Sequence, residues 1–256
     1  MIGGVLRGLT AVLHGRVRRA LEHGYVRLRW GRDLPALARH FGTDKWDDHW
    51  YAQHYQTFFA PLRGRRLRVL EIGVGGYEDP RRGGASLRMW KAYFPKARII
   101  GVDINDKRPH DEERIRTVVG SQDDESFLKG LSAQEGPFDI VIDDGSHLNR
   151  HVIRSFEILF PLLAENGFYV VEDLQTSYWR EFGGAPAEDR EAPTSMNFFK
   201  ALADTMNYRE FHPRPADWQP HPLGRHIVAM HFFHNLVFVE KGRNDEPSNR
   251  NDARRS

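Results

Sequence analysis

The 256-residue sequence contains no cysteine. This absence excludes disulfide bonds, thiol nucleophiles and zinc sites with thiolate ligands. No apolar run approaches the ~18 consecutive residues that a membrane-spanning helix needs. The net charge of +2 shows no large excess of either sign, so nucleic acid is not an expected partner. The length suits one large α/β domain with appendages, and we expect a cytoplasmic enzyme.

The first 21 residues contain no acidic residue, but they include four arginines. Apolar residues recur there at helical spacing: Val5, Leu6, Leu9, Leu13, Val17 and Leu21. The pattern predicts a basic amphipathic helix that packs on the rest of the chain or on a second copy, so we expect a homo-oligomer. Contact with an anionic membrane through this helix is the alternative, and it is not favoured.

We predict three regions along the chain. Residues 1–37 form the N-terminal basic amphipathic helical extension, and residues 38–241 form the catalytic domain. Residues 242–256 are polar and lack large apolar side chains, which predicts a disordered tail.

Within the central region, strand-like apolar runs alternate with helical patterns. Strands are expected over residues 67–73, 98–103, 116–119, 138–142 and 168–171, and helices over 85–94, 124–131 and 149–164, the last with Ser146 as its N-cap. Such alternation predicts a parallel sheet with right-handed crossovers. Two final runs, 226–232 and 236–241, predict a hairpin. The expected fold is α/β, with a mostly parallel seven-stranded sheet that ends in an antiparallel hairpin and helices on both faces.

Two acidic clusters each follow an apolar strand-like run. The first is Asp143-Asp144-Gly145-Ser146-His147, and the second is Glu172-Asp173. Ligands of open α/β sheets bind at the carboxyl ends of strands, so neighbouring strands would bring these side chains into one pocket. Closely spaced carboxylates repel one another, and a hard divalent cation relieves that repulsion. His147 is then placed to move a proton beside the metal.

A glycine-rich turn follows the first expected strand, with Gly73, Gly75 and Gly76 after Glu71. A dinucleotide fingerprint needs a further glycine where Glu78 stands, which argues against a hydride-transfer enzyme. Asp103, at the end of the second strand, suits two ribose hydroxyls, and residues 120–123 after the third strand can reach an adenine edge. Together these segments describe a pocket for S-adenosylmethionine.

These motifs resemble those of the class I S-adenosylmethionine-dependent methyltransferases, and in particular the metal-dependent macrolide sugar O-methyltransferases of the mycinamicin and macrocin-precursor type. The resemblance covers roughly residues 38–241 and includes residues 41–45 and 49–51 upstream. Members of that family carry a sizeable domain before the catalytic one, where this sequence has residues 1–37, so the identity of the acceptor does not carry over.

The resemblance implies a Rossmann-like fold and specific roles for individual residues. Mg²⁺ would be bound by Asp144, Glu172 and Asp173, and His147 would be the general base, with Asp144 beside it in the reaction. S-adenosylmethionine would contact Glu71, Gly73, Gly75, Asp103, Ser121, Gln122, Asp123, Thr43 and Tyr51. The acceptor would be a sugar hydroxyl of a glycoside, oligosaccharide or polysaccharide.

Alternatives stay open at several points. Asp143 and Asp144 can serve as a turn and helix cap, and Asp143 suits structural work better than Asp144. A catechol- or phenol-type metal-dependent O-methyltransferase would use similar carboxylates, and a non-enzymatic binding module can share the fold. Tyr178 and Trp179 either stack on a sugar ring or serve as core contacts, the second being favoured. Which sugar and which hydroxyl are not determined by the sequence.

Overall fold

The computed structural model describes residues 24–211, 219 and 221–248. These residues form two compact units: a helical unit of residues 24–66 and 84–97, and a sheet unit of residues 67–83 and the described residues from 98 onward. The predicted basic helix, with its proposed membrane or oligomer contact, lies in residues 1–23, outside the described residues. The boundaries of the three predicted regions stay a prediction.

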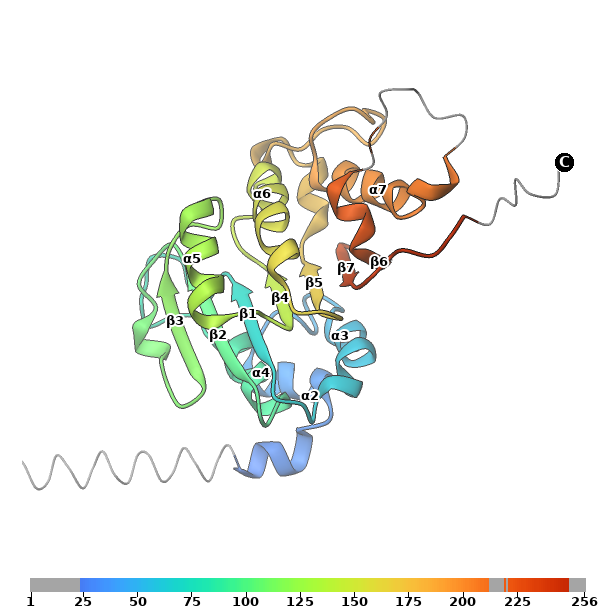
Figure 1. Cartoon of the computed structure of the whole chain (residues 1–256). Helices are drawn as coiled ribbons and strands as arrows, with labels where there is room; N and C mark the ends of the chain where they lie inside the picture. Colours follow the sequence, from blue (N-terminus) through green and yellow to red (C-terminus); the bar gives the residue numbers. More distant parts are fainter. Residues whose placement is uncertain (1–23, 212–218, 220, 249–256) are drawn as a thin grey trace, which may run out of the picture. The chain divides into compact units, whose positions relative to one another are not determined.

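The sheet unit contains seven strands in the order β3-β2-β1-β4-β5-β7-β6 (Figure 1). Strands β1 to β5 pair in parallel, whereas β7 pairs antiparallel with both β5 and β6. Their bounds are β1 (Arg68–Ile72), β2 (Arg98–Asp103), β3 (Ile115–Val119), β4 (Ile140–Asp143), β5 (Phe168–Val171), β6 (Ile227–Phe233) and β7 (Leu236–Lys241). The predicted mostly parallel seven-stranded sheet with an antiparallel hairpin end is therefore confirmed.

Three helices of the sheet unit pack against one face of the sheet. They are α5 (Glu125–Glu135), α6 (Asn149–Leu159) and α7 (Ser195–Met206). Their apolar side chains, including Leu128, Phe156 and Phe199, join strand residues such as Leu70 and Val141 in one buried cluster. Burial of this apolar surface is the main force that holds the unit together.

Helix α6 begins at Asn149, as predicted, but its N-cap is not the residue that the sequence suggested. Its N-cap is Leu148, which makes no capping hydrogen bond through its side chain. The predicted cap, Ser146, lies two residues earlier, and its Oγ accepts a hydrogen bond from the Leu148 backbone N–H at 3.3 Å. The Ser146 prediction was wrong because the Gly145–Leu148 segment remains a loop before the helix starts.

The helical unit contains α2 (Leu34–Phe41), α3 (Ala52–Phe59) and α4 (Ala85–Tyr93). The Asp33 carboxylate caps α2 through the Ala36 N–H, and Gly42 ends that helix in a left-handed conformation. An aromatic core joins α3 to α4, with the ring centroids of Tyr55 and Trp90 5.0 Å apart. This unit also carries two residues that were predicted to contact the cofactor, Thr43 and Tyr51.

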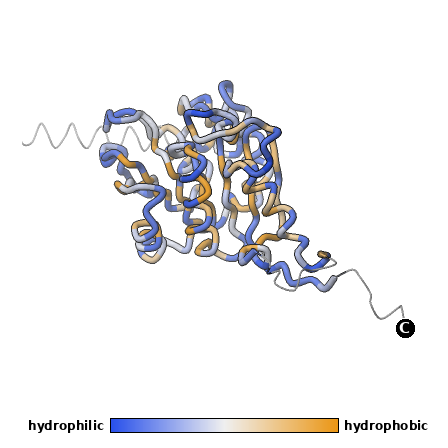
Figure 2. The backbone as a smooth tube through the Cα atoms, turned by 90° about the horizontal axis from the view of Figure 1, so that it is seen from above, coloured by the Kyte–Doolittle hydropathy of each residue, from blue (hydrophilic) through white to orange (hydrophobic). Residues whose placement is uncertain are grey.

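Short 3-10 segments complete the described structure: η1 (Ala60–Leu62), η2 (Arg108–His110), η3 (Phe160–Leu162), η4 (Leu174–Tyr178), η5 (Arg180–Phe182), η6 (Tyr208–Glu210) and η7 (Pro222–Arg225). Hydrophobic and hydrophilic stretches alternate along the chain (Figure 2). Among the described residues, no helix combines the length and apolar character that a membrane crossing requires.

Candidate active site

Five loops meet at the carboxyl edge of the parallel strands. In the strand register, Ile72 lies beside Asp143 and Asp143 lies beside Val171, so the loops after β1, β4 and β5 begin next to one another. Asp103 pairs with Val119 in the same way at the ends of β2 and β3. Strands β4 and β5 are therefore neighbours, which is the condition for the two acidic clusters to share one pocket.

The turn after β1 approaches the loop after β4 too closely for any side chain. A Cβ atom added to Gly73 would lie 2.0 Å from the Asp144 carbonyl oxygen, and Gly73 has a φ of 92°. The Asp144 N–H donates to the Ile72 carbonyl at 2.9 Å, which locks the two loops together. Glycine is required here by both backbone conformation and space.

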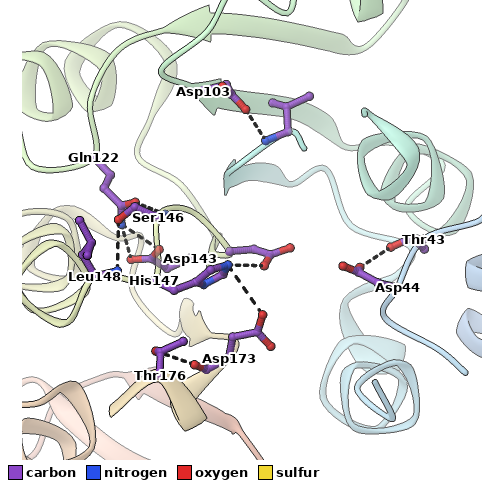
Figure 3. Close-up of polar contacts among 12 residues, drawn as sticks. Thr43, Asp44, Asp103, Gln122, Asp143, Ser146, His147, Leu148, Asp173 and Thr176 are labelled. Carbon is purple, nitrogen blue, oxygen red and sulfur yellow. Dashed lines mark hydrogen bonds and ion pairs between the residues drawn. The ribbon is translucent and has the colours of Figure 1, made fainter. Parts of the chain in front are cut away.

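Asp103 organises the same turn from the end of β2. Its two carboxylate oxygens accept hydrogen bonds from the backbone N–H groups of Val74 (3.0 Å) and Asn105 (2.8 Å) (Figure 3). Each carboxylate oxygen can accept more than one hydrogen bond, so Asp103 retains capacity for ligand hydroxyls. Glu71 lies fully buried at the end of β1.

A buried lysine that the sequence analysis missed holds the loop beyond the turn. Lys107 is 1% exposed, and its Nζ donates to the carbonyl oxygens of Tyr77 (2.6 Å) and Asp79 (2.8 Å). Asn105 Nδ2 also donates to the Tyr77 carbonyl at 3.2 Å. The segment after β2 thus fixes both the glycine turn, through Asp103, and the loop that follows it, through Lys107.

The side chain of Gln122 turns inward. Its Nε2 donates to Asp143 at 3.0 Å, and its Oε1 accepts from the Ser146 N–H at 2.7 Å (Figure 3). Both ends of the amide are therefore engaged in joining the loop after β3 to the loop after β4. Gln122 was predicted only as a cofactor contact, because this bridge joins residues 21 and 24 positions apart along the chain.

Ser121 and Asp123 flank that bridge and are more exposed. Ser121 Oγ donates to Asp123 at 2.5 Å, and this hydrogen bond is the main cause that lowers the pKa of the Asp123 carboxyl. His151 Nε2 lies 3.2 Å from the other Asp123 oxygen, and its Nδ1 lies 3.0 Å from Ser146 Oγ. Asp123 therefore remains an anion at neutral pH.

Asp143 points away from the loops and into the sheet unit's interior. Its carboxylate accepts hydrogen bonds from Gln122 Nε2, Ser155 Oγ (2.5 Å) and the Tyr169 hydroxyl (3.2 Å). Burial raises the pKa of Asp143 to about 6, because desolvation of the charged form outweighs these hydrogen bonds. Its position agrees with the structural role that was preferred for Asp143 over Asp144.

The predicted metal residues come together in part. One ligand atom each of Asp144, His147 and Asp173 lies within 4.8 Å of the others. His147 Nε2 is 3.9 Å from an Asp144 oxygen and 3.7 Å from an Asp173 oxygen (Figure 3). Glu172 follows β5 directly and is buried, and it is not part of this group. Two of the three predicted metal carboxylates and the predicted imidazole thus converge at the carboxyl edge, and the role of Glu172 stays a prediction.

Two members of that group have strained backbones. His147 and Asp173 each have a φ of 56°, a left-handed conformation that costs a residue with a side chain roughly 1–2 kcal/mol. Such strain persists when surrounding contacts enforce it, and it is concentrated at functional sites. The Asp173 carbonyl, for example, accepts from the Thr176 N–H (3.1 Å) and Thr176 Oγ1 (2.8 Å).

Asn149, also missed by the sequence analysis, anchors the loop after β5. Its Nδ2 donates to the carbonyl oxygens of Thr176 (3.1 Å) and Phe182 (2.9 Å), and its Oδ1 accepts from the Ser195 N–H at 2.7 Å. Only the tertiary structure reveals this role, because the bonded residues lie 27 to 46 positions away along the chain.

The two aromatic residues of that loop are not core contacts. Tyr178 is 44% exposed and Trp179 is 45% exposed, so the favoured prediction for them was wrong. The remaining predicted cofactor residues, Thr43 and Tyr51, are buried in the helical unit, where the Tyr51 ring stacks on His49 at 4.9 Å. Their contact with a cofactor stays a prediction.

No known protein-family profile matches the sequence. The mycinamicin VI 2''-O-methyltransferase of Micromonospora griseorubida is 48% identical over 215 residues, which are 84% of this chain and 54% of that protein. The 8-demethyl-8-alpha-L-rhamnosyl tetracenomycin-C 2'-O-methyltransferase of Streptomyces olivaceus is 50% identical over 218 residues, 84% of this chain and 57% of that protein. The chain spans about half the length of these curated relatives.

The solved structures include a similar fold. The MycE methyltransferase from the mycinamycin biosynthetic pathway, in complex with Mg and SAH, superposes with a TM-score of 0.81 at 48% identity. The match covers 84% of this chain and 55% of that one. Over the matched residues, this chain is a homologue of macrolide and tetracenomycin sugar O-methyltransferases, and it has the Rossmann-like fold of class I methyltransferases.

Proposed function

We propose that this protein transfers a methyl group from S-adenosylmethionine to a hydroxyl of a sugar, with the help of a bound divalent metal. The observation that carries the proposal is the convergence of Asp144, His147 and Asp173 at the carboxyl edge, directly against the glycine turn after β1. This proximity supports the proposal because methyl transfer requires the methyl donor and the proton acceptor to lie around the same acceptor hydroxyl. The sugar-specific relatives described above support the same class of acceptor.

The residues present fit a magnesium ion. Asp144 and Asp173 place carboxylate oxygens close together in a half-buried position, where an unneutralised pair would repel. We propose these two carboxylates and the adjacent Glu172 as the ligands. When bound, Mg²⁺ supplies Lewis-acid stabilisation to a hydroxyl oxygen that loses its proton.

The glycine turn and its neighbours fit S-adenosylmethionine, which supplies an activated methyl group. Gly75 leaves space beside the backbone, since an added Cβ atom would meet only the Gly83 Cα at 3.8 Å, and Asp103 still has hydrogen-bonding capacity for ribose hydroxyls. Gly73 is proposed as a contact through its backbone, because the Asp144 carbonyl fills the space where a side chain would start. The remaining proposed contacts are Glu71, Ser121, Gln122, Asp123, Thr43 and Tyr51. For Gln122 the contact would come from its backbone, because both ends of its amide are engaged within the protein.

His147 is proposed as the general base. A sugar hydroxyl is a weak acid, so its attack on the methyl group needs a proton acceptor at hand. Its Nε2 lies 3.9 Å from an Asp144 oxygen and 3.7 Å from an Asp173 oxygen, so the imidazole is placed beside the proposed metal position, where the hydroxyl loses its proton. General-base help of this kind contributes about 10²–10⁴-fold to turnover.

The test is methyl transfer with S-adenosylmethionine and two acceptors, methyl α-L-rhamnoside and catechol, each with Mg²⁺ or with excess chelator. We expect methylation of the rhamnoside only when Mg²⁺ is present. Binding of S-adenosylhomocysteine, measured by calorimetry, should persist in chelator. Methylation of catechol alone would identify the phenol-type alternative, and rhamnoside turnover unchanged by chelator would refute the metal's role.

The last points of the proposal are the size of the acceptor, the oligomeric state and the cellular location. We propose a small glycoside as the acceptor, in line with the glycosylated compounds named for the relatives. A homo-oligomer and a cytoplasmic location stay predictions. Light scattering of the purified protein would test the first of these.

A further inference from the structure

An aromatic row leads away from the proposed base. The Phe182 ring centroid lies 6.4 Å from that of His147, at an interplanar angle of 63°. The centroid of the Trp179 ring lies 6.0 Å from that of Phe182. All three residues belong to the sheet unit, and the two aromatics come from the loop after β5. The row therefore starts where the acceptor hydroxyl must lose its proton.

The outer end of the row is open to solvent. Trp179 is 45% exposed and Phe182 is half-buried. Single exposed apolar residues are common on protein surfaces and need no explanation. Here, however, two large aromatic rings are neighbours beside a cluster of titratable groups, and small-molecule sites combine aromatic walls with a few convergent polar groups.

The backbone that carries the rings is held firmly. Asn149, itself buried, binds the Phe182 carbonyl at 2.9 Å. The Gly184 N–H donates to the Trp179 carbonyl at 2.9 Å, and a Cβ atom on Gly184 would lie 2.4 Å from the Trp179 nitrogen. Ser177 Oγ meets Ser195 Oγ at 2.8 Å and accepts from the Met196 N–H at 3.0 Å, which fixes the loop to α7. A surface ordered in advance loses little freedom when a ligand binds.

We propose that Trp179 and Phe182 form an acceptor-binding subsite that contacts an apolar ring face of the glycoside whose hydroxyl faces His147. This inference rests on the proposed function and adds the residues that select the acceptor. Aromatic rings bury a large apolar area and favour flat partners, and the C–H face of a pyranose or the ring of an attached aglycone has that shape. Neither ring carries a group that exchanges protons in the reaction, so their contribution is to binding.

The test compares Trp179→Ala with the parent protein in steady-state kinetics. Two acceptors are used at saturating S-adenosylmethionine and Mg²⁺: methyl α-L-rhamnoside, and a rhamnoside with a large apolar aglycone. We expect KM for the acceptor to rise about tenfold, with kcat and the Kd for S-adenosylhomocysteine unchanged within about twofold. Trp179→Phe should recover most of the loss.

A matched control is Leu162→Ala, which removes an exposed apolar side chain just before β5, at the opposite edge of the sheet. Its KM should stay at the parent value. A KM increase for both acceptors would assign the contact to the sugar ring, and an increase only for the larger acceptor would assign it to the aglycone. Both results support the subsite.

An unchanged KM in Trp179→Ala, with an active parent protein, would overturn the subsite and leave the proposed function standing. A parent protein that methylates neither glycoside would instead overturn the proposed function. A loss confined to kcat would also contradict the inference, because it would place Trp179 in the chemical step rather than in binding.

Discussion

The turn after β1 and the loops after β4 and β5 both bend the chain through left-handed backbone conformations, but with different residues. After β1 these positions are mainly glycines, Gly73, Gly75 and Gly76, followed by Tyr77, whereas those that follow β4 and β5 include His147 and Asp173. Glycine adopts this conformation without steric cost, whereas a residue with a Cβ atom does not. At His147 and Asp173 the loops carry backbone strain at residues that also present a side chain to the site.

The two regions are also held in different ways. The glycine turn is fixed by side chains from the segment after β2, through Asp103 and the buried Lys107. The loops after β4 and β5 are fixed largely by two polar side chains, Gln122 from the loop after β3 and Asn149 from α6. The glycine turn therefore exposes backbone groups, whereas the loops after β4 and β5 present charged side chains.

We expect the greatest loss of activity from substitution of His147, the histidine with a left-handed backbone. His147→Asn should lower turnover about 10²–10⁴-fold, because asparagine tolerates the left-handed backbone but cannot accept the proton. Calorimetry should show S-adenosylhomocysteine binding close to the parent value. The control His226→Asn changes an exposed histidine at the opposite edge of the sheet and should keep full activity. Parent-level turnover in His147→Asn would remove the base from the mechanism.

The second prediction concerns the stability of the glycine turn after β1. Gly73→Ala should lower the free energy of unfolding by about 3 kcal/mol, because the new Cβ atom meets the Asp144 carbonyl and φ is positive. Urea denaturation measures this change. The control Gly130→Ala, inside α5 with nothing within 4 Å of the added atom, should raise stability by about 0.5–1 kcal/mol. Equal stability in both variants would contradict the close contact.

A smaller effect is expected at the buried lysine. Lys107→Met leaves the carbonyl oxygens of Tyr77 and Asp79 without its ammonium, so the loop should loosen and the Kd for S-adenosylhomocysteine should rise about tenfold. Lys129→Met removes an exposed lysine that pairs with Glu125 and serves as control. If the two variants bind S-adenosylhomocysteine equally well, Lys107 does not position the cofactor loop.

The smallest change in stability is expected at Asp173, a left-handed residue that is also a proposed metal ligand. Asp173→Gly should leave the free energy of unfolding unchanged or raise it by up to about 1 kcal/mol, because glycine relieves the left-handed backbone. Mg²⁺ binding, followed by calorimetry, should be lost. Asn166→Gly, at another left-handed position before β5, should change neither quantity appreciably. A clear loss of stability in Asp173→Gly would show that its side chain is structurally required.

Much of the fold followed from local patterns. The strands over 98–103 and 168–171 have the predicted bounds, and β7 does as well, because alternating apolar runs and short turns report on neighbouring residues in the chain. The start of α6 at Asn149 was also predicted, but its N-cap was wrong, since a cap depends on where the preceding loop finishes. For the candidate site, the loops were predicted correctly, but the inward-turned Gln122 and the exposed Trp179 were not.

The strand–helix order, the hairpin end and the loops that carry glycines and carboxylates could be predicted from the amino-acid sequence, because apolar periodicity and residue type act over short distances. That Asp143 turns inward while Asp144 joins His147 and Asp173 became apparent from the three-dimensional structure. The structure also shows that Lys107 and Asn149 anchor the two kinds of loop. These outcomes depend on hydrogen bonds between residues 21 to 28 positions apart, whose geometry exists only after the sheet has assembled.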